Sequence, residues 1–140
     1  MKDFKIVDFI KAVKEKIDLE KNDIDSVSKK IPNYYCACLT YSTKIAKELI
    51  DAESKYTEVY AQKIEYYINE HNLDIFKKLT NKEDREKYIN GIDKELTSLK
   101  KCVNIYRSNI ETVDSIMKML KDAQFSIKNI LEWEKFKRGG

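Results

Sequence analysis

Residues 55–72, with the sequence KYTEVYAQKIEYYINEHN, place four tyrosines and two lysines within eighteen positions. Four of these side chains share one stripe of a helix, because they follow one another at spacings of four, three and four residues: Tyr56, Tyr60, Lys63 and Tyr67. Tyrosine rings stack on unpaired nucleotide bases and lysines neutralise phosphates, which is the chemistry of binders that hold a single strand without reading its sequence. Tyrosines also fill semi-polar helix interfaces, where the ring packs and the hydroxyl reaches water. The stripe therefore admits two interpretations, a nucleic-acid contact or a helix interface.

Other kinds of chemistry lack a matching set of residues. The glycines are Gly91 and the terminal pair, so no glycine-rich loop can hold a nucleotide phosphate. His71 is the only histidine, which leaves a multi-histidine metal site and a catalytic triad without support; we interpret it as a polar residue that closes a long helix. Asp93 and Glu95 are two positions apart on a predicted helix, so they face apart and are interpreted as solvated surface. We predict a binding protein that is not an enzyme and has no metal and no cofactor.

The composition indicates long helices in about one domain. Charged residues make up 36% of the 140 residues, with only three glycines and one proline, a mixture that favours helix over sheet. The formal net charge of +3 is too small to imply a polyanionic partner by itself. The opening MKDFKIVDFIKAV carries a charge every few residues, so no apolar run approaches the roughly 18 residues of a membrane span, and we expect no membrane association.

The three cysteines form an odd, sparse set that fits a reducing cytosol: Cys36, Cys38 and Cys102. Cys36 and Cys38 point about 200° apart on a helix, which makes them a poor metal chelate. We interpret all three as small apolar helix residues.

Apolar periodicity predicts helices along most of the chain. A short amphipathic helix is indicated by four residues at helical spacing: Ile6, Ile10, Val13 and Ile17. A long helix is predicted from about residue 30 to 69, with Pro32 in its first turn, the position that proline tolerates best. Thr80 and Glu83 have the spacing of a capping box, and a further turn is expected at Gly91.

The last third of the chain carries a heptad-like row of side chains. Steps of four and three residues continue without a slip, with one polar interruption at Gln124, through Ile92, Leu96, Leu99, Val103, Tyr106, Ile110, Val113, Met117, Leu120, Gln124, Ile127 and Leu131. A second row widens this apolar face: Cys102, Ile105, Ile116, Ala123 and Ile130. A wide seam needs more than one neighbouring helix, so we expect part of it to meet another copy of the chain, as in a bundle or a ring of subunits. A monomeric antiparallel hairpin is the alternative.

Two segments resemble the UvsY recombination-mediator proteins of T-even-type bacteriophages. That family ends in a helix with a G/A-F-x-I-K-x-I core, followed by an aromatic or bulky residue and a basic tail. KDAQFSIKNILEWEKFKRGG at residues 121–140 places Phe125, Ile127, Lys128 and Ile130 in this core, with Phe136 after it. The family also has a basic-x-basic-Leu-acidic-Tyr-Tyr segment, to which AQKIEYY at residues 61–67 is similar. The resemblance covers residues 20–140 in patches.

The resemblance implies an all-α, helical ring-like homo-oligomer of six or seven subunits that binds single-stranded DNA. Proteins of this kind load a phage RecA-like recombinase onto strands coated by single-strand-binding protein and hydrolyse nothing themselves. The resemblance further implies that the protein acts in recombination, repair and replication, in the cytoplasm of the infected bacterial host. In one continuous domain, residues 1–79 are then the DNA-binding region and residues 80–140 the oligomerisation region.

The resemblance also suggests site residues. In the family the basic pair before Tyr-Tyr is implicated in DNA binding; here Lys63 takes the second basic position, while Ala61 replaces the first. Lys44, Lys47 or Lys55 could compensate from preceding turns, and Lys29 and Lys30 could add to the surface in a ring. The predicted DNA contacts are Lys63, Tyr66, Tyr67, Tyr60, Lys55 and Lys47. The predicted oligomerisation residues are Val113, Met117, Leu120, Ile127, Ile130 and Leu131. A coiled-coil scaffold that binds only proteins is the alternative function, and the tyrosine stripe would then be an interface.

Overall fold

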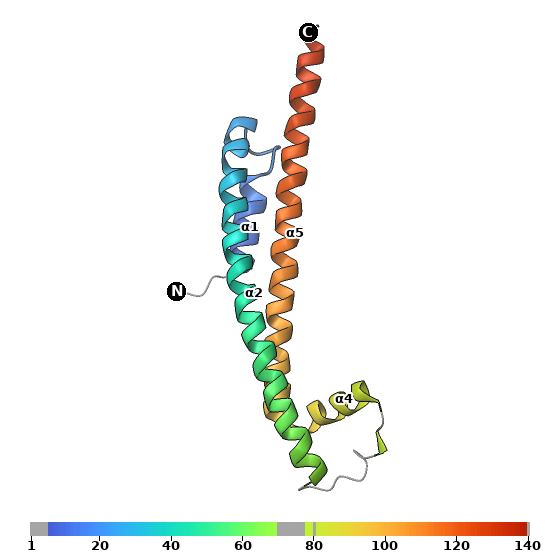
Figure 1. Cartoon of the computed structure of the whole chain (residues 1–140). Helices are drawn as coiled ribbons and strands as arrows, with labels where there is room; N and C mark the ends of the chain where they lie inside the picture. Colours follow the sequence, from blue (N-terminus) through green and yellow to red (C-terminus); the bar gives the residue numbers. More distant parts are fainter. Residues whose placement is uncertain (1–5, 70–77, 80, 140) are drawn as a thin grey trace. The chain divides into compact units, whose positions relative to one another are not determined.

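The computed structural model describes residues 6–69, 78–79 and 81–139. These residues contain four long or medium helices and no strand (Figure 1), which confirms the all-α prediction: α1 (Ile6–Lys16), α2 (Ile24–Asn69), α4 (Lys82–Ile92) and α5 (Lys94–Lys137). The predicted amphipathic helix corresponds to α1, whose Val13 is fully buried. His71 and Thr80 lie outside the described residues.

The long helix begins earlier than its proline suggests. The Ser26 N–H donates to Asp23 Oδ1 (2.6 Å), so an aspartate caps α2 and the helix starts at Ile24. Pro32 therefore lies inside the helix, and the expectation that it occupies a first turn is wrong. An internal proline removes one backbone hydrogen bond and crowds the preceding turn. Burial of Val27, Ile31 and Cys38 on both sides of it offsets that cost.

The connection between α4 and α5 is a single residue. Asn81 caps α4 by accepting a hydrogen bond from the Glu83 N–H (2.8 Å). Gly91 continues the helix, and the chain breaks two residues later at Asp93, whose backbone is extended (φ −106°, ψ 111°). The expected break thus occurs within YINGID (residues 88–93), but at Asp93 and not at Gly91. It depends on a side chain, because Asp93 Oδ1 accepts the Leu96 N–H (3.0 Å) and caps α5.

The chain divides into two compact units. Unit 1 combines Met1–Lys44 with Asn109–Gly140, and unit 2 is Ile45–Ser108. In unit 1 the Phe9 ring of α1 contacts the Tyr34 ring of α2 edge-on (centroids 6.1 Å apart). Its buried residues come from α1, the first part of α2 and the second part of α5, and include Val13, Val27, Cys38, Val113, Ile116 and Leu120.

Unit 2 packs the second part of α2 against α4 and the first part of α5. Its buried cluster draws on all three helices: Tyr56, Val59, Ile89, Leu96 and Val103. Partly buried residues packed against this cluster include Leu49, Tyr60, Ile64, Tyr67 and Leu99. The tyrosines of the predicted stripe thus belong to the interior side of unit 2.

The heptad-like row of α5 is largely covered by the chain itself. Leu96, Val103, Val113, Leu120 and Ile127 are buried, whereas Gln124 is exposed. The row emerges at its two ends, where Ile92 is 46% and Leu131 is 51% exposed. Most of the seam therefore has partners within one protomer.

Candidate nucleic-acid interface

Lys63 is held by two carboxylates from the start of α5. Its ammonium Nζ lies 3.2 Å from Asp93 Oδ2 and 3.3 Å from Glu95 Oε2. The Tyr67 hydroxyl donates to the same Asp93 oxygen (2.9 Å). Both carboxylates contact Lys63, so the interpretation that Asp93 and Glu95 face apart is wrong. Asp93 is also only 6% exposed and is not solvated surface, whereas the Glu95 side chain is 58% exposed, as expected. The extended backbone at Asp93 breaks the helical geometry on which that interpretation depended, and both carboxylates reach α2.

These contacts keep the acid and the base in their charged forms. Burial by itself would raise the pKa of Asp93, but the Leu96 N–H, the Tyr67 hydroxyl and the Lys63 ammonium together hold this pKa below its usual value. Hydrogen bonding to Asp93 and Glu95 raises the pKa of Lys63. Lys63 is thus a structural cation that joins α2 to the start of α5.

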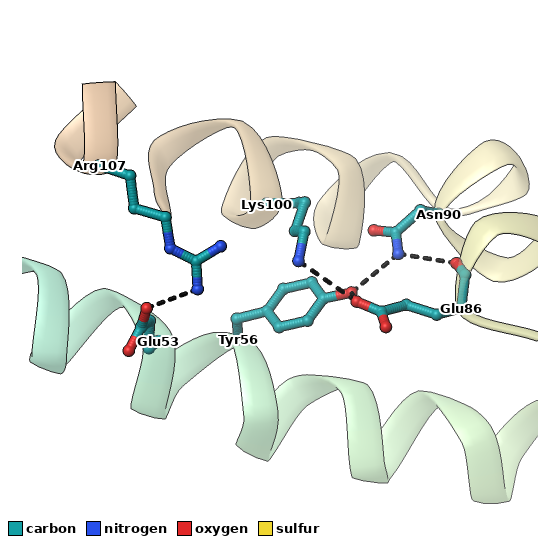
Figure 2. Close-up of polar contacts among 6 residues, drawn as sticks. All are labelled: Glu53, Tyr56, Glu86, Asn90, Lys100 and Arg107. Atoms are coloured by element: carbon teal, nitrogen blue, oxygen red, sulfur yellow. Dashed lines mark hydrogen bonds and ion pairs between the residues drawn. The ribbon is translucent and has the colours of Figure 1, made fainter. Parts of the chain in front are cut away.

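A second polar cluster surrounds the Tyr56 hydroxyl (Figure 2). This hydroxyl donates to Glu86 Oε1 (2.9 Å) and accepts from Asn90 Nδ2 (2.8 Å). Lys100 Nζ lies 3.3 Å from the same Glu86 oxygen and 5.0 Å from the centroid of the Tyr56 ring. Burial would raise the pKa of Glu86, but hydrogen bonds from Tyr56 and Lys100 hold it below its usual value. The cluster fixes the Tyr56 ring, which is 8% exposed, in one position.

The Tyr56 hydroxyl makes the free energy of unfolding depend on pH in the alkaline range. Burial, assisted by Glu86, raises the pKa of Tyr56 from 10.0 to about 12. Because the folded-state pKa lies above that of the unfolded chain, this stabilisation is complete below about pH 10 and is lost as the pH rises toward 12. We expect the free energy of unfolding to lose roughly 2–3 kcal/mol through Tyr56 over that interval.

Urea denaturation at a series of pH values measures this loss. Tyr56→Phe has no hydroxyl to ionise, so its free energy of unfolding should fall less steeply above pH 10 than that of the unchanged protein. Equal slopes for the two proteins would contradict this role of Tyr56. The variant also removes a hydrogen-bond partner of Glu86 and of Asn90, which lowers its stability at every pH. The test therefore compares the slopes against pH and not the absolute free energies of unfolding.

A cavity of about 340 Å³ opens beside the Tyr56 cluster. Its lining combines three cations with two tyrosines and acidic side chains, among them Glu53, Tyr56, Tyr60, Lys82, Lys100 and Arg107. Arg107 Nη2 lies 2.7 Å from Glu53 Oε1, and the two side chains are 51% and 42% exposed. The Tyr56 and Tyr60 rings are stacked, with centroids 5.8 Å apart and planes inclined by 16°. We call this cavity the Tyr60 pocket.

The six predicted DNA contacts fall into two groups. Lys63, Tyr60 and Tyr67 are partly buried and engaged within unit 2. Lys47, Lys55 and Tyr66 are exposed, with the Tyr66 ring edge-on to Tyr67 (5.3 Å, 73°). The structure therefore joins Lys63 to Tyr67 through Asp93, and Tyr60 to Tyr56, but it brings neither Lys47 nor Lys55 to these clusters.

Sequence reasoning missed the cations of the Tyr60 pocket. Lys100 and Arg107 are seven residues apart and flank Val103, a spacing that indicates one helix face. That signal is present in the sequence, but it does not reveal that this face meets the tyrosines of α2. Asp93 also had a signal, since an aspartate before a helical run is a preferred N-cap.

The predicted oligomerisation residues differ in what they offer to another chain. Val113, Leu120 and Ile127 are 0%, 0% and 7% exposed, so they are buried within the protomer. Met117 and Ile130 are partly buried. Leu131 is exposed, and so are three aromatic residues of the same helix end: Phe125, Trp133 and Phe136.

Two negative findings apply to the part of the chain that the structure describes. No group of three or more His, Cys, Asp or Glu side chains there is arranged to hold a metal ion. In the same residues, no helix combines the length and apolar character needed to cross a bilayer.

Comparison with known proteins gives one family. A family model described as "Recombination, repair and ssDNA binding protein UvsY" matches residues 12–140. No curated protein and no solved structure matches the chain. The family match spans nearly the whole sequence and confirms the resemblance carried by the two short motifs. This chain belongs to the UvsY family of recombination, repair and single-stranded-DNA-binding proteins.

Proposed function

We propose that this protein is a recombination mediator. It binds single-stranded DNA coated by single-strand-binding protein and loads a RecA-like phage recombinase onto it, during phage recombination, repair and replication in the cytoplasm of the bacterial host. It catalyses no reaction itself and needs no cofactor. The observation that carries this proposal is the UvsY family match over residues 12–140. The match favours a DNA-binding role over a scaffold that binds only proteins.

A test of mediator function measures the DNA-dependent ATP hydrolysis of a RecA-like phage recombinase. On oligo-dT saturated with single-strand-binding protein, this activity should be low and should rise when the UvsY-family protein is added. On naked oligo-dT the addition should change it little. No rise on the coated strand, under conditions where the protein binds DNA, would contradict loading.

We propose that the active form is a homo-oligomer of six or seven subunits. Support comes from the apolar side chains left exposed near the end of α5, among which Leu131 continues the row of Leu120 and Ile127. Trp133 and Phe136 stack on each other (5.7 Å, 19°), with Lys137 Nζ 5.5 Å from the centroid of the Trp133 ring. A net charge of +3 per chain becomes substantial when several copies share one strand, and multivalency then strengthens individually weak contacts.

Within each subunit, the exposed candidates Lys47, Lys55 and Tyr66 are the stronger choices for direct DNA contacts. A phosphate that approached Lys63 would have to compete with Asp93 and Glu95. The lysines of the exposed α2 face alternate with exposed acidic residues, Asp51, Glu58 and Glu65, so attraction along this face is moderate. Moderate, salt-sensitive contacts suit a mediator that must hand its strand to a recombinase.

Fluorescence anisotropy with labelled oligo-dT tests these contacts. Wild-type protein should bind, and its affinity should fall with added salt. The double variant Lys47→Gln/Lys55→Gln should bind several-fold more weakly at low salt. Its plot of log affinity against log salt should be flatter by about 0.7 for each phosphate that the variant no longer neutralises.

The matched control removes two exposed lysines from α1, as Lys11→Gln/Lys14→Gln. It has the same net charge as the α2 variant but keeps the proposed contacts. Equal effects of the two double variants would mean that Lys47 and Lys55 act only through net charge.

A further inference from the structure

The Tyr60 pocket combines the two groups that a single-strand binder needs. Lys82 comes from α4, Lys100 and Arg107 from α5, and both stacked tyrosines from α2. Figure 2 shows the Lys100 and Arg107 side chains extending from α5 toward α2, where Tyr56 and Glu53 lie. Aromatic rings and cations therefore face one cavity, although each cation is at least 22 positions from either tyrosine in the sequence.

The cations of the pocket differ in their freedom to accept a new partner. Lys100 is committed to Glu86 and to the buried Tyr56 ring, so it mainly compensates an acidic side chain. Arg107 is paired with Glu53 at a half-exposed position, and such exposed pairs contribute little net stability. A guanidinium has five N–H donors in a planar fork that matches phosphate oxygens. Arg107 can thus give up its contact with Glu53 for a phosphate, or bind the carboxylate and the phosphate at the same time.

The aromatic side of the pocket is already ordered. The Tyr56 ring is fixed by hydrogen bonds to Glu86 and Asn90, and the Tyr60 ring stacks on it while remaining only partly buried. A base that packs against Tyr60 would therefore meet a ring that loses little freedom on binding. The cavity volume of about 340 Å³ lies within the range of small-ligand pockets, roughly 300–1,000 Å³.

We propose that the Tyr60 pocket takes one nucleotide of the bound single strand. Arg107, with Lys82 nearby, binds its phosphate, and Tyr60 packs against its base. This site is separate from the lysines on the exposed face of α2, and it rests on the proposed binding of single-stranded DNA. It assigns a DNA role to residues of α4 and α5 as well as α2.

Anisotropy titrations of the full-length protein test the pocket with two oligonucleotides, oligo-dT and an abasic strand of equal length. Tyr60→Leu keeps apolar bulk but removes the ring, so it should weaken oligo-dT binding about tenfold to a hundredfold and leave abasic binding unchanged. Arg107→Gln should weaken binding to both strands several-fold. It should also reduce the slope of log affinity against log salt by about 0.7. Lys101→Gln, which removes an exposed lysine of the same helix that does not line the pocket, is the charge-matched control and should have a smaller effect.

The outcomes separate the pocket from the proposed function. Wild-type protein that fails to bind oligo-dT would overturn single-strand binding altogether. If the wild-type protein binds oligo-dT, but Arg107→Gln lowers the affinity no more than Lys101→Gln does, the pocket proposal is overturned and single-strand binding remains intact. Arg107 is half-exposed, so its variant keeps this test valid even if Tyr60→Leu loses helicity in circular dichroism.

Discussion

Asp93→Ala is expected to lower the free energy of unfolding by about 3 kcal/mol. The Asp93 carboxylate is 6% exposed and satisfies three donors: the Leu96 N–H, the Tyr67 hydroxyl and the Lys63 ammonium. Alanine removes the cap of α5, which is worth about 1 kcal/mol. It also leaves two partly buried donors of α2 with fewer partners, and unsatisfied donors of this kind cost about 1–3 kcal/mol.

Two variants act as controls in the same urea denaturation experiment. Asp93→Asn keeps an oxygen that can cap α5 but loses the charge, so its stability should lie between those of wild type and Asp93→Ala. Glu95→Gln changes the other partner of Lys63. The Glu95 side chain is 58% exposed, so this variant should alter the free energy of unfolding by less than about 1 kcal/mol. An Asp93→Ala protein as stable as Glu95→Gln would show that the buried contact contributes little.

Leu131→Asp is expected to dissociate the proposed homo-oligomer while each chain stays folded. Leu131 is 51% exposed in the protomer, so a carboxylate there remains hydrated in the free chain. In an assembly that buries this side chain, an unpaired carboxylate would cost several kcal/mol for each subunit. Sedimentation velocity should therefore show a fall in mass toward that of one chain, with circular dichroism unchanged.

The choice of Leu131 follows from burial along its row. Leu120 and Ile127 are buried within the protomer, so an aspartate at either position would unfold unit 1 and would not report on assembly. Asn129→Asp is the matched control, because it adds the same charge at an exposed position of the same helix end. An oligomer that keeps its mass in Leu131→Asp would place the interface elsewhere.

Local sequence patterns determined the helices and the family. Helix formation depends on side-chain spacing within a few turns and on the scarcity of glycine and proline, both of which can be read directly from the chain. The row from Leu96 to Leu131 lies on the single helix α5, whereas Ile92, its predicted first member, lies on α4 before the break at Asp93. The motif around Phe125 and the AQKIEYY segment likewise indicated the family that the comparison shows. Where a local rule failed, at Pro32, burial on both sides of the proline outweighed its preference for a first turn.

The tertiary structure alone decided what each helix face contacts. Periodicity places Tyr56, Tyr60, Lys63 and Tyr67 on one stripe, but it contains no information about which segment covers that stripe. The break at Asp93 brings the carboxylates of Asp93 and Glu95 to Lys63. The packing of α4 and α5 against α2 brings Lys100 and Arg107 to the tyrosines. Contacts between residues far apart in sequence depend on how the chain returns on itself, and for this reason the pocket could not be predicted from spacing.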